Sequence, residues 1–193
     1  MSRGTAPPLL LASRSPQRRA ILTQLGVPFE VCPADVEELS DGDPQAVAVE
    51  NARRKAVALA ARRPDATVLG VDTIVVLGEG IHGKPADAAA ARATLAALAG
   101  RDHVVVSGIC AVRPGAPPAT AAARTRVRFR DVDDATLDWY VATGEWRERA
   151  GGYAIQGRGA ALVAGIEGDY LNVVGLPVAA LLELLPEILH GGA

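Results

Sequence analysis

The segment from Val68 to Pro85, VLGVDTIVVLGEGIHGKP, constrains this 193-residue chain more strongly than its other segments. It places one carboxylate, Asp72, between two apolar runs, VLGV and TIVVL, that are typical of buried strand. Acidic side chains are almost never fully buried unless a partner compensates their charge. A turn with Gly78 and Gly80 leads to Lys84, which a hairpin would return to the neighbourhood of Asp72. This pattern suits the binding of a metal and a phosphate, and a buried Asp–Lys ion pair without chemistry is the alternative.

A second group of polar residues lies near the amino terminus, in LLLASRSPQRRAILTQLG. Residues 9–11 are predicted to form a short buried strand, and Pro16 suits the first turn of a helix that stops at Gly26. The polar side chains at this junction are Ser13, Arg14, Gln17 and Arg18. A helix N-terminus offers free N–H groups and a positive dipole end, so the junction can bind an anion. The alternative is an N-cap followed by solvated arginines, since the segment has neither the P-loop nor the dinucleotide-binding glycine pattern.

A third segment, residues 145–159, is rich in glycine and arginine. Glycines at this density let the backbone approach a ligand or adopt positive φ. The amide of Gln156 stands in the otherwise apolar run YAIQG and needs a hydrogen-bond partner, which the edge of a nucleotide base would provide. The alternative is a long surface loop with solvated arginines.

Taken together, these segments resemble the Maf family of nucleoside triphosphate pyrophosphatases. LASRSPQRRAILTQLG is similar to the family pattern LASxSPRRxxLLxxLG, and GVDTIVVLGEGIHGKP is similar to GxDTxVxxxGxxxxKP. RAGGYAIQG and IEGDYLNVVGLP are similar to KAGxYxIQG and IxGxYxNVxGLP. The matches run from Leu11 to Pro177 in the family's order. The resemblance implies cleavage of a nucleoside triphosphate between the α and β phosphates, which yields the monophosphate and pyrophosphate.

The resemblance also implies roles for individual residues. Asp72 falls at the family's catalytic acid, as general base or metal-positioning carboxylate. Lys55 and Lys84 match family lysines that would neutralise phosphate oxygens, and Arg18 matches the second arginine of SPRR. Glu38 matches an acid that would hold a metal together with Asp72, although Glu37 stands one place away. The reaction needs a divalent cation, and hard oxygen ligands favour Mg²⁺ or Mn²⁺.

Two positions indicate the substrate branch of the family. Thr73 and Gln156 stand where the branch that acts on dTTP and UTP has Thr and Gln, whereas the 7-methyl-GTP branch has Gln and Glu. An amide offers a donor and an acceptor together, as the edge of uracil does. Three positions depart from the family pattern and keep modified pyrimidine triphosphates open as substrates: Gln17 replaces an arginine, Arg149 replaces a lysine, and Trp146 replaces a proline and could stack on a base or pack.

Composition excludes several other classes of function. A net charge of −2 gives no case for a nucleic-acid or membrane partner, and the amino terminus lacks a signal-peptide pattern, so we expect a cytoplasmic protein. The three histidines lack metal-ligand spacing, and Cys32 and Cys110 are expected to be small buried hydrophobes. A nucleotide-binding regulator of cell division or septum formation, acting through protein partners, is the alternative to an enzyme.

The alternation of strand and helix patterns predicts an α/β fold in a single domain over residues 1–193. After the first strand and helix, strands are expected at 29–32, 68–77, 102–112 and 121–130, and helices at 44–63, 86–99, 133–143 and 177–189. The Maf resemblance adds an elongated two-lobed form with a curved mixed sheet and flanking helices, with the substrate cleft between the lobes, and it allows a homodimer.

Overall fold

The computed structural model describes residues 9–189, and these form the predicted mixed α/β fold around one seven-stranded sheet. The strands are β1 (Leu9–Leu11), β2 (Phe29–Val31), β3 (Thr67–Leu77), β4 (Gly80–His82), β5 (Asp102–Val112), β6 (Ala119–Phe129) and β7 (Val163–Glu167). The helices are α1 (Pro16–Gln24), α2 (Pro44–Ala60), α3 (Ala88–Leu98), α4 (Asp134–Ala142), α5 (Tyr170–Val174) and α6 (Val178–Leu184), with the 3₁₀-helices η1 (Ala150–Gly152), η2 (Gly157–Leu162) and η3 (Pro186–Leu189). The strand order is β2-β1-β3-β5-β6-β7, with β4 paired to β3.

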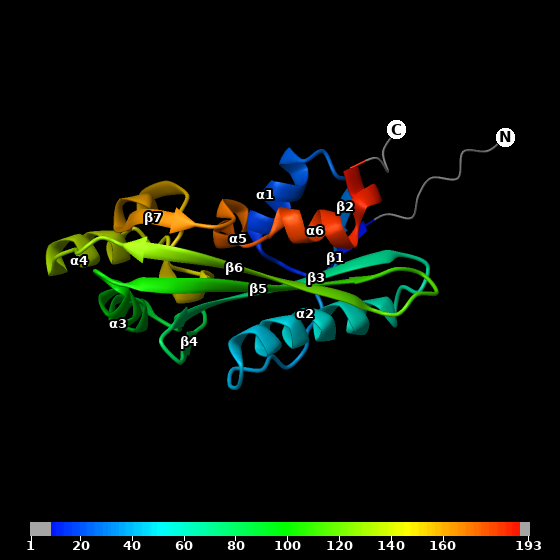
Figure 1. Cartoon of the computed structure of the whole chain (residues 1–193), viewed down its shortest axis with the longest axis horizontal. Coiled ribbons are helices and arrows are strands. Elements are labelled where there is room, and N and C mark those ends of the chain that lie inside the picture. Colours follow the sequence, from blue (N-terminus) through cyan, green and yellow to red (C-terminus); the bar gives the residue numbers. More distant parts are fainter. Residues whose placement is uncertain (1–8, 190–193) are drawn as a thin grey trace.

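Three long strands connect the two ends of the molecule. β3, β5 and β6 each have 11 residues and pair antiparallel, which gives each a length of about 36 Å. β1 is parallel to both β2 and β3. Figure 1 shows α2 beneath these strands, α1 and α6 above them at one end, and α3 and α4 at the other end. The long strands are therefore shared by two lobes.

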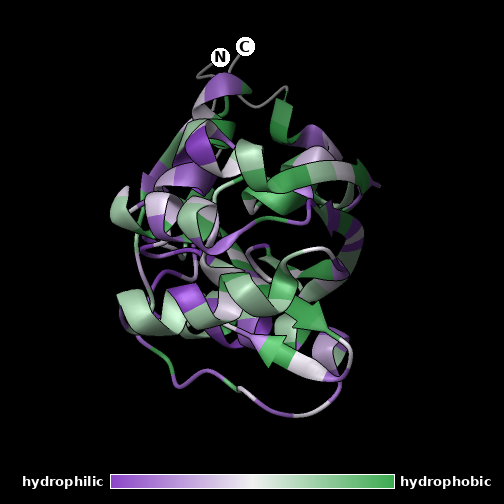
Figure 2. Ribbon diagram, turned by 90° about the vertical axis from the view of Figure 1, so that its left-hand side faces the viewer, coloured by the Kyte–Doolittle hydropathy of each residue, from purple (hydrophilic) through white to green (hydrophobic). Residues whose placement is uncertain are grey.

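Each lobe has its own apolar core. One core joins β1, α1, α6 and the near half of β3, with Leu11, Leu22 and Leu181 fully buried. The other joins α3, α4, η1 and the far ends of β5 and β6 around Leu95 and Tyr140. Hydrophobic and hydrophilic residues alternate along the helices and strands (Figure 2), as expected for elements that bury one face. No helix among residues 9–189 combines the length and the apolarity that crossing a membrane requires.

α2 lies directly on the sheet because the facing residues are small. Its buried face carries Ala48, Ala52 and Ala56, spaced one turn apart and all fully buried. A Cβ added to Gly70 of β3 would overlap the Ala52 carbonyl oxygen, and one added to Gly108 of β5 would overlap the Ala48 backbone. The two glycines therefore set the depth at which the whole of α2 sits.

The structure corrects several details of the sequence prediction. The last helix does not run from 177 to 189: α6 ends at Leu184, and η3 follows at Pro186. Pro186 lacks an N–H and disfavours helical backbone at the preceding residue, which explains the break. The short elements β7 and α5 were not predicted at all. Cys110 is buried as expected, but Cys32 is only half-buried and donates to Glu30 Oε1 at 3.2 Å.

The close approach of α2 gives a prediction about stability. Gly70→Ala and Gly108→Ala should each lower the free energy of unfolding by about 1–3 kcal/mol, because the added methyl overpacks the contact with the helix backbone. Gly83→Ala is the matched control, since a Cβ there meets no atom within 4 Å. Urea denaturation measures all three. Equal effects at the three positions would show that the contact with α2 is not tight.

Candidate active site

A cleft opens where the edge of β3 lacks a neighbouring strand. β1 pairs with residues 67–69 of β3, and β4 pairs with residues 75–77 on the same edge. Between them, residues 70–74 have no strand partner on this edge within the described chain. The cleft has a volume of about 1110 Å³ and is lined by residues of both lobes. Ligand pockets commonly have about 300–1,000 Å³, so a nucleoside triphosphate fits.

Asp72 lies on this open part of β3, and only 6% of the residue is exposed. Its Oδ1 accepts a hydrogen bond from Lys55 Nζ at 2.7 Å, and its Oδ2 accepts one from Asn51 Nδ2 at 3.1 Å. Lys55 Nζ also contacts Glu38 Oε1 at 2.8 Å. Asn51 is fixed in turn by two hydrogen bonds with the backbone of Leu39. Two carboxylates thus converge on one ammonium group at the wall of the cleft.

The cation beside Asp72 comes from α2 and not from the hairpin that follows β3. Lys84 lines the same cleft, but its Nζ pairs with Glu148 Oε2 at 2.8 Å, and both side chains are exposed. Lys55 reaches Asp72 because α2 crosses β3 at contact distance. A buried Asp–Lys ion pair is present, but it is formed with Lys55, and it lies at the wall of a cleft large enough for a nucleotide.

Arg18 ties three separate segments together. Its Nε donates to the Gly175 carbonyl at 2.9 Å, its Nη1 to Ser13 Oγ at 2.8 Å, and its Nη2 to Thr73 Oγ1 at 3.2 Å. Thr73 Oγ1 lies 2.9 Å from Ser107 Oγ as well. Burial lowers the pKa of the Arg18 guanidinium, and the nearby carboxylates of Asp72 and Glu38 oppose that shift. Arg18 therefore holds the three segments together and also contributes a positive charge to the cleft.

The remaining predicted side chains lie around the cleft without touching Asp72. Arg14 pairs with Asp35 at 3.2 Å, and both side chains are exposed. Gln17 Oε1 accepts a hydrogen bond from Ser15 Oγ at 3.0 Å. Gln156 lines the cleft, is exposed, and its amide makes no hydrogen bond to residues 9–189. The structure thus brings every predicted site residue to one cleft, from both lobes.

Two groups near the site were not predicted as functional. The sequence shows only that Asn51 and Lys55 lie one turn apart on the same helix face. That spacing is the one feature of the sequence from which a shared contact with Asp72 could have been predicted. Tyr153 lines the cleft, and its hydroxyl lies 2.9 Å from His103 Nε2. Burial lowers the pKa of His103 to about 4, so this histidine is neutral at pH 7.

Trp146 packs and does not line the cleft. It is 5% exposed, and its Nε1 donates to the Val141 carbonyl at 3.1 Å. The guanidinium of Arg147 lies over its ring, 4.6 Å from the centroid. Of the two roles left open for Trp146, the structure supports packing.

The donor set fits a hard divalent cation that is shared with a substrate. Asp72 and Glu38 already place carboxylate oxygens within 2.8 Å of one positive group. No cluster of three or more His, Cys, Asp or Glu side chains among residues 9–189 could hold a metal by itself. Mg²⁺ is commonly bound by one or two carboxylates together with substrate phosphates, and it needs no closed protein cage.

Solved structures share this fold at low sequence identity. The structure of a HAM1 protein from Coxiella burnetii matches 95% of this chain and 98% of its own, with a TM-score of 0.53 and 19% identity. A nucleoside-triphosphatase (dITP/XTP pyrophosphatase) from Mycobacterium abscessus matches 93% of this chain and 98% of its own, with a TM-score of 0.50 and 17% identity. At such identities the likeness establishes the fold alone.

Sequence comparison gives closer relatives. A dTTP/UTP pyrophosphatase of Moorella thermoacetica is 50% identical over 92% of this chain and 93% of its own. Proteins of the same name from Symbiobacterium thermophilum and Deinococcus radiodurans are 47% and 44% identical, over 96% and 94% of this chain and 98% and 93% of their own. The family model described as Maf-like protein matches residues 8–188. The chain therefore belongs to the Maf family.

Proposed function

We propose that this protein is a nucleoside triphosphate pyrophosphatase that hydrolyses dTTP and UTP, and modified pyrimidine triphosphates of similar shape, to the monophosphate and pyrophosphate. The observation that carries the proposal is Asp72, a buried carboxylate fixed by Lys55 and Asn51 at the open edge of β3 in a cleft of nucleotide size. The names of the relatives support the activity and the substrate class. They do not favour a regulator of cell division without turnover.

In this proposal Asp72 acts on the attacking water. Its carboxylate accepts a proton from the water as the oxygen bonds to phosphorus at the α–β anhydride. The bridging P–O bond breaks, and its electron pair leaves with the departing group, which is pyrophosphate for attack at the α-phosphorus and the nucleoside monophosphate for attack at the β-phosphorus. Lys55 and Asn51 keep both oxygens of Asp72 in place, so the base needs no reorganisation before the step.

Cations from both lobes neutralise the triphosphate. Arg14, Lys55 and Lys84 each hold an acidic side chain in the free protein, and the pairs of Arg14 and Lys84 are exposed. Exposed ion pairs contribute little to stability, on the order of 0–1 kcal/mol, so a phosphate can displace the acid at small cost. Ser13 and Arg18 complete the phosphate end, next to the first turn of α1.

Glu38 and Asp72 are the residues that would hold the divalent cation, for which Mg²⁺ is proposed and Mn²⁺ is the alternative. When bound, the cation supplies positive charge to the phosphate oxygens on which negative charge develops. Lys55 contacts both carboxylates and keeps them close together before substrate arrives.

In this proposal, the lobe that carries η1 and η2 binds the nucleotide base. Gln156 presents a free amide to the cleft, and its donor and acceptor match the edge of thymine or uracil. The hydroxyl of Thr73 is already engaged with Arg18 and Ser107, so Thr73 acts by orienting Arg18. Gln17 is held by Ser15 at the facing wall.

The proposal extends to the organisation of the protein. One domain over residues 1–193 carries the activity, in the cytoplasm, as a homodimer. Its partner is the nucleotide, and neither nucleic acid nor a membrane is required. The net charge of −2 supports that last point, because attraction to a polyanion needs an excess of cations.

Asp72→Asn should reduce the rate of dTTP hydrolysis by about 10²–10⁴, the usual cost of removing a general base, while nucleotide binding is largely retained. Asp65→Asn is the matched control, because its side chain is 78% exposed and lies outside the cleft. Pyrophosphate release measures the rate, and thermal unfolding checks that both variants fold. Turnover of the Asp72 variant within a few-fold of wild type would refute the assignment.

The specificity prediction compares dTTP, UTP, dGTP and 7-methyl-GTP as substrates with magnesium. The wild type should prefer the two pyrimidines, and Gln156→Glu should weaken the pyrimidine activity about ten- to hundred-fold in kcat/KM. The carboxylate loses the donor and places a charge against a carbonyl oxygen, an error of about 1–3 kcal/mol. The control is Gln45→Glu, an exposed position outside the cleft. A wild type that favours 7-methyl-GTP would overturn the substrate class, and an unchanged pyrimidine activity in the variant would remove Gln156 from the base pocket.

A further inference from the structure

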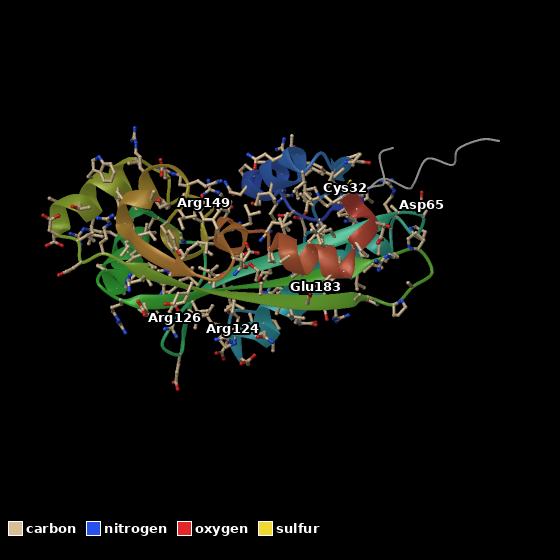
Figure 3. All side chains as sticks on the ribbon, turned by 45° about the horizontal axis from the view of Figure 1, so that its top comes forward. Cys32, Asp65, Arg124, Arg126, Arg149 and Glu183 are labelled. Carbon is tan, nitrogen blue, oxygen red and sulfur yellow. The ribbon has the colours of Figure 1, made fainter. Side chains whose placement is uncertain are left out.

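One cation of the cleft has no partner among residues 9–189. Arg149 lines the cleft, is half-buried, and lies between the lobe of α4 and helix α1 in Figure 3. Its Nε and Nη1 are buried and make no hydrogen bond within the described chain. The other cleft cations are Arg14, Lys55 and Lys84, each on a carboxylate, and Arg18, on a carbonyl and two hydroxyls.

The two acids nearest to Arg149 in sequence are already engaged. Glu148 holds Lys84 at 2.8 Å. Glu145 accepts hydrogen bonds from the backbone N–H groups of Arg158, at 3.0 Å, and Gly159, at 3.3 Å. Burial lowers the pKa of the Arg149 guanidinium, and Tyr140, Glu145 and Glu148 do not fully offset this shift. A guanidinium is nevertheless always charged at neutral pH, so the structure holds a positive charge here that no salt bridge within residues 9–189 neutralises.

The backbone fixes Arg149 close to the loop that carries Lys84. Arg149 directly precedes η1, and the Gly151 N–H of that helix donates to the Gly83 carbonyl at 3.0 Å. Gly83 is the neighbour of Lys84 in the chain. Gly151 has a φ of 67° and lies against Val75 of β3, so η1 cannot shift easily. The loops that carry Arg149 and Lys84 are thus hydrogen-bonded to each other, and both side chains line the cleft.

We propose that Arg149 is a substrate-binding residue whose guanidinium donates hydrogen bonds to phosphate oxygens of the nucleotide. A carbonyl oxygen of a base could accept these N–H groups but would leave the charge uncompensated. A phosphate satisfies the donors and the charge together, and a guanidinium matches its geometry with two parallel hydrogen bonds. Gln17, which also lines the cleft, stands where the family pattern has an arginine, and Arg149 adds a guanidinium to the same cleft. Only the identity of the nucleotide rests on the proposed function.

Stability separates a binding role from a structural one. If Arg149 served the fold, its truncation would lower the melting temperature. An unpaired, desolvated charge instead disfavours the free protein, so Arg149→Met should leave the melting temperature unchanged or raise it. Arg147→Met is the matched control: Arg147 is two residues away, exposed, stacked on Trp146 and outside the cleft.

Isothermal titration calorimetry with magnesium tripolyphosphate, a probe that has no base, tests the proposal. Arg149→Met should weaken binding at least tenfold, Arg149→Lys should weaken it less because the charge is kept, and Arg147→Met should bind within about twofold of wild type. Binding of thymidine, followed by NMR, should be unchanged in all three. Unchanged tripolyphosphate affinity in Arg149→Met, or loss confined to thymidine, would overturn the proposal. Should the Met variant not fold, Arg149→Gln, which also removes the charge, is measured in its place against the same tenfold criterion.

The outcome is separable from that of the proposed function. A wild type that binds tripolyphosphate but does not hydrolyse dTTP would reject the pyrophosphatase activity and leave the role of Arg149 intact. A wild type that hydrolyses dTTP, together with an Arg149→Met variant of undiminished affinity and KM, would reject the role of Arg149 alone.

Discussion

The burial of Asp72 beside Lys55 is the interaction on which the rest of the structure depends. A carboxylate that is 6% exposed requires a compensating cation, and the cation must come from an element that packs on β3 itself. Helix α2 meets that requirement because Gly70 and Gly108 admit its backbone to contact distance. The glycines, the alanine face of α2 and the Asp72–Lys55 pair are therefore parts of one constraint.

The open edge of β3 gives a ligand access to the Asp72–Lys55 pair. β1 and β4 have three residues each and cover opposite ends of the same edge, which leaves residues 70–74 without a strand partner in the described part of the chain. The shared strands β3, β5 and β6 then place the polar junction at the start of α1 and the loops around η1 on one cleft. Cations of both lobes face the gap, and carboxylates occupy three of them in the free protein. Arg18 and Arg149 are the cleft cations that no carboxylate of residues 9–189 pairs with.

Much of this could be predicted from sequence because its signals are local. The acid within an apolar strand, the proline at the start of α1 and the positions of Asn51 and Lys55 one turn apart are all visible in the chain. The partner of Asp72 was not visible, because the distance between α2 and β3 is set by glycines far apart in sequence. Strand β7 and helix α5 were not predicted for a related reason: each has only five residues, and long-range contacts decide their conformation. The lack of a partner for Arg149 among residues 9–189 was not visible either, because it depends on the bonds that Glu145 and Glu148 make to other groups.

A double-mutant cycle on unfolding free energy measures how strongly Asp72 and Lys55 depend on each other. Urea denaturation of wild type, Asp72→Asn, Lys55→Met and the double variant gives the coupling between the two side chains. We expect the double variant to lose less stability than the sum of the single variants, with a coupling of about 1–3 kcal/mol, because each single change leaves the other group buried without its partner. Single effects that add to within about 0.5 kcal/mol would show that Asp72 and Lys55 are independent and would contradict the account.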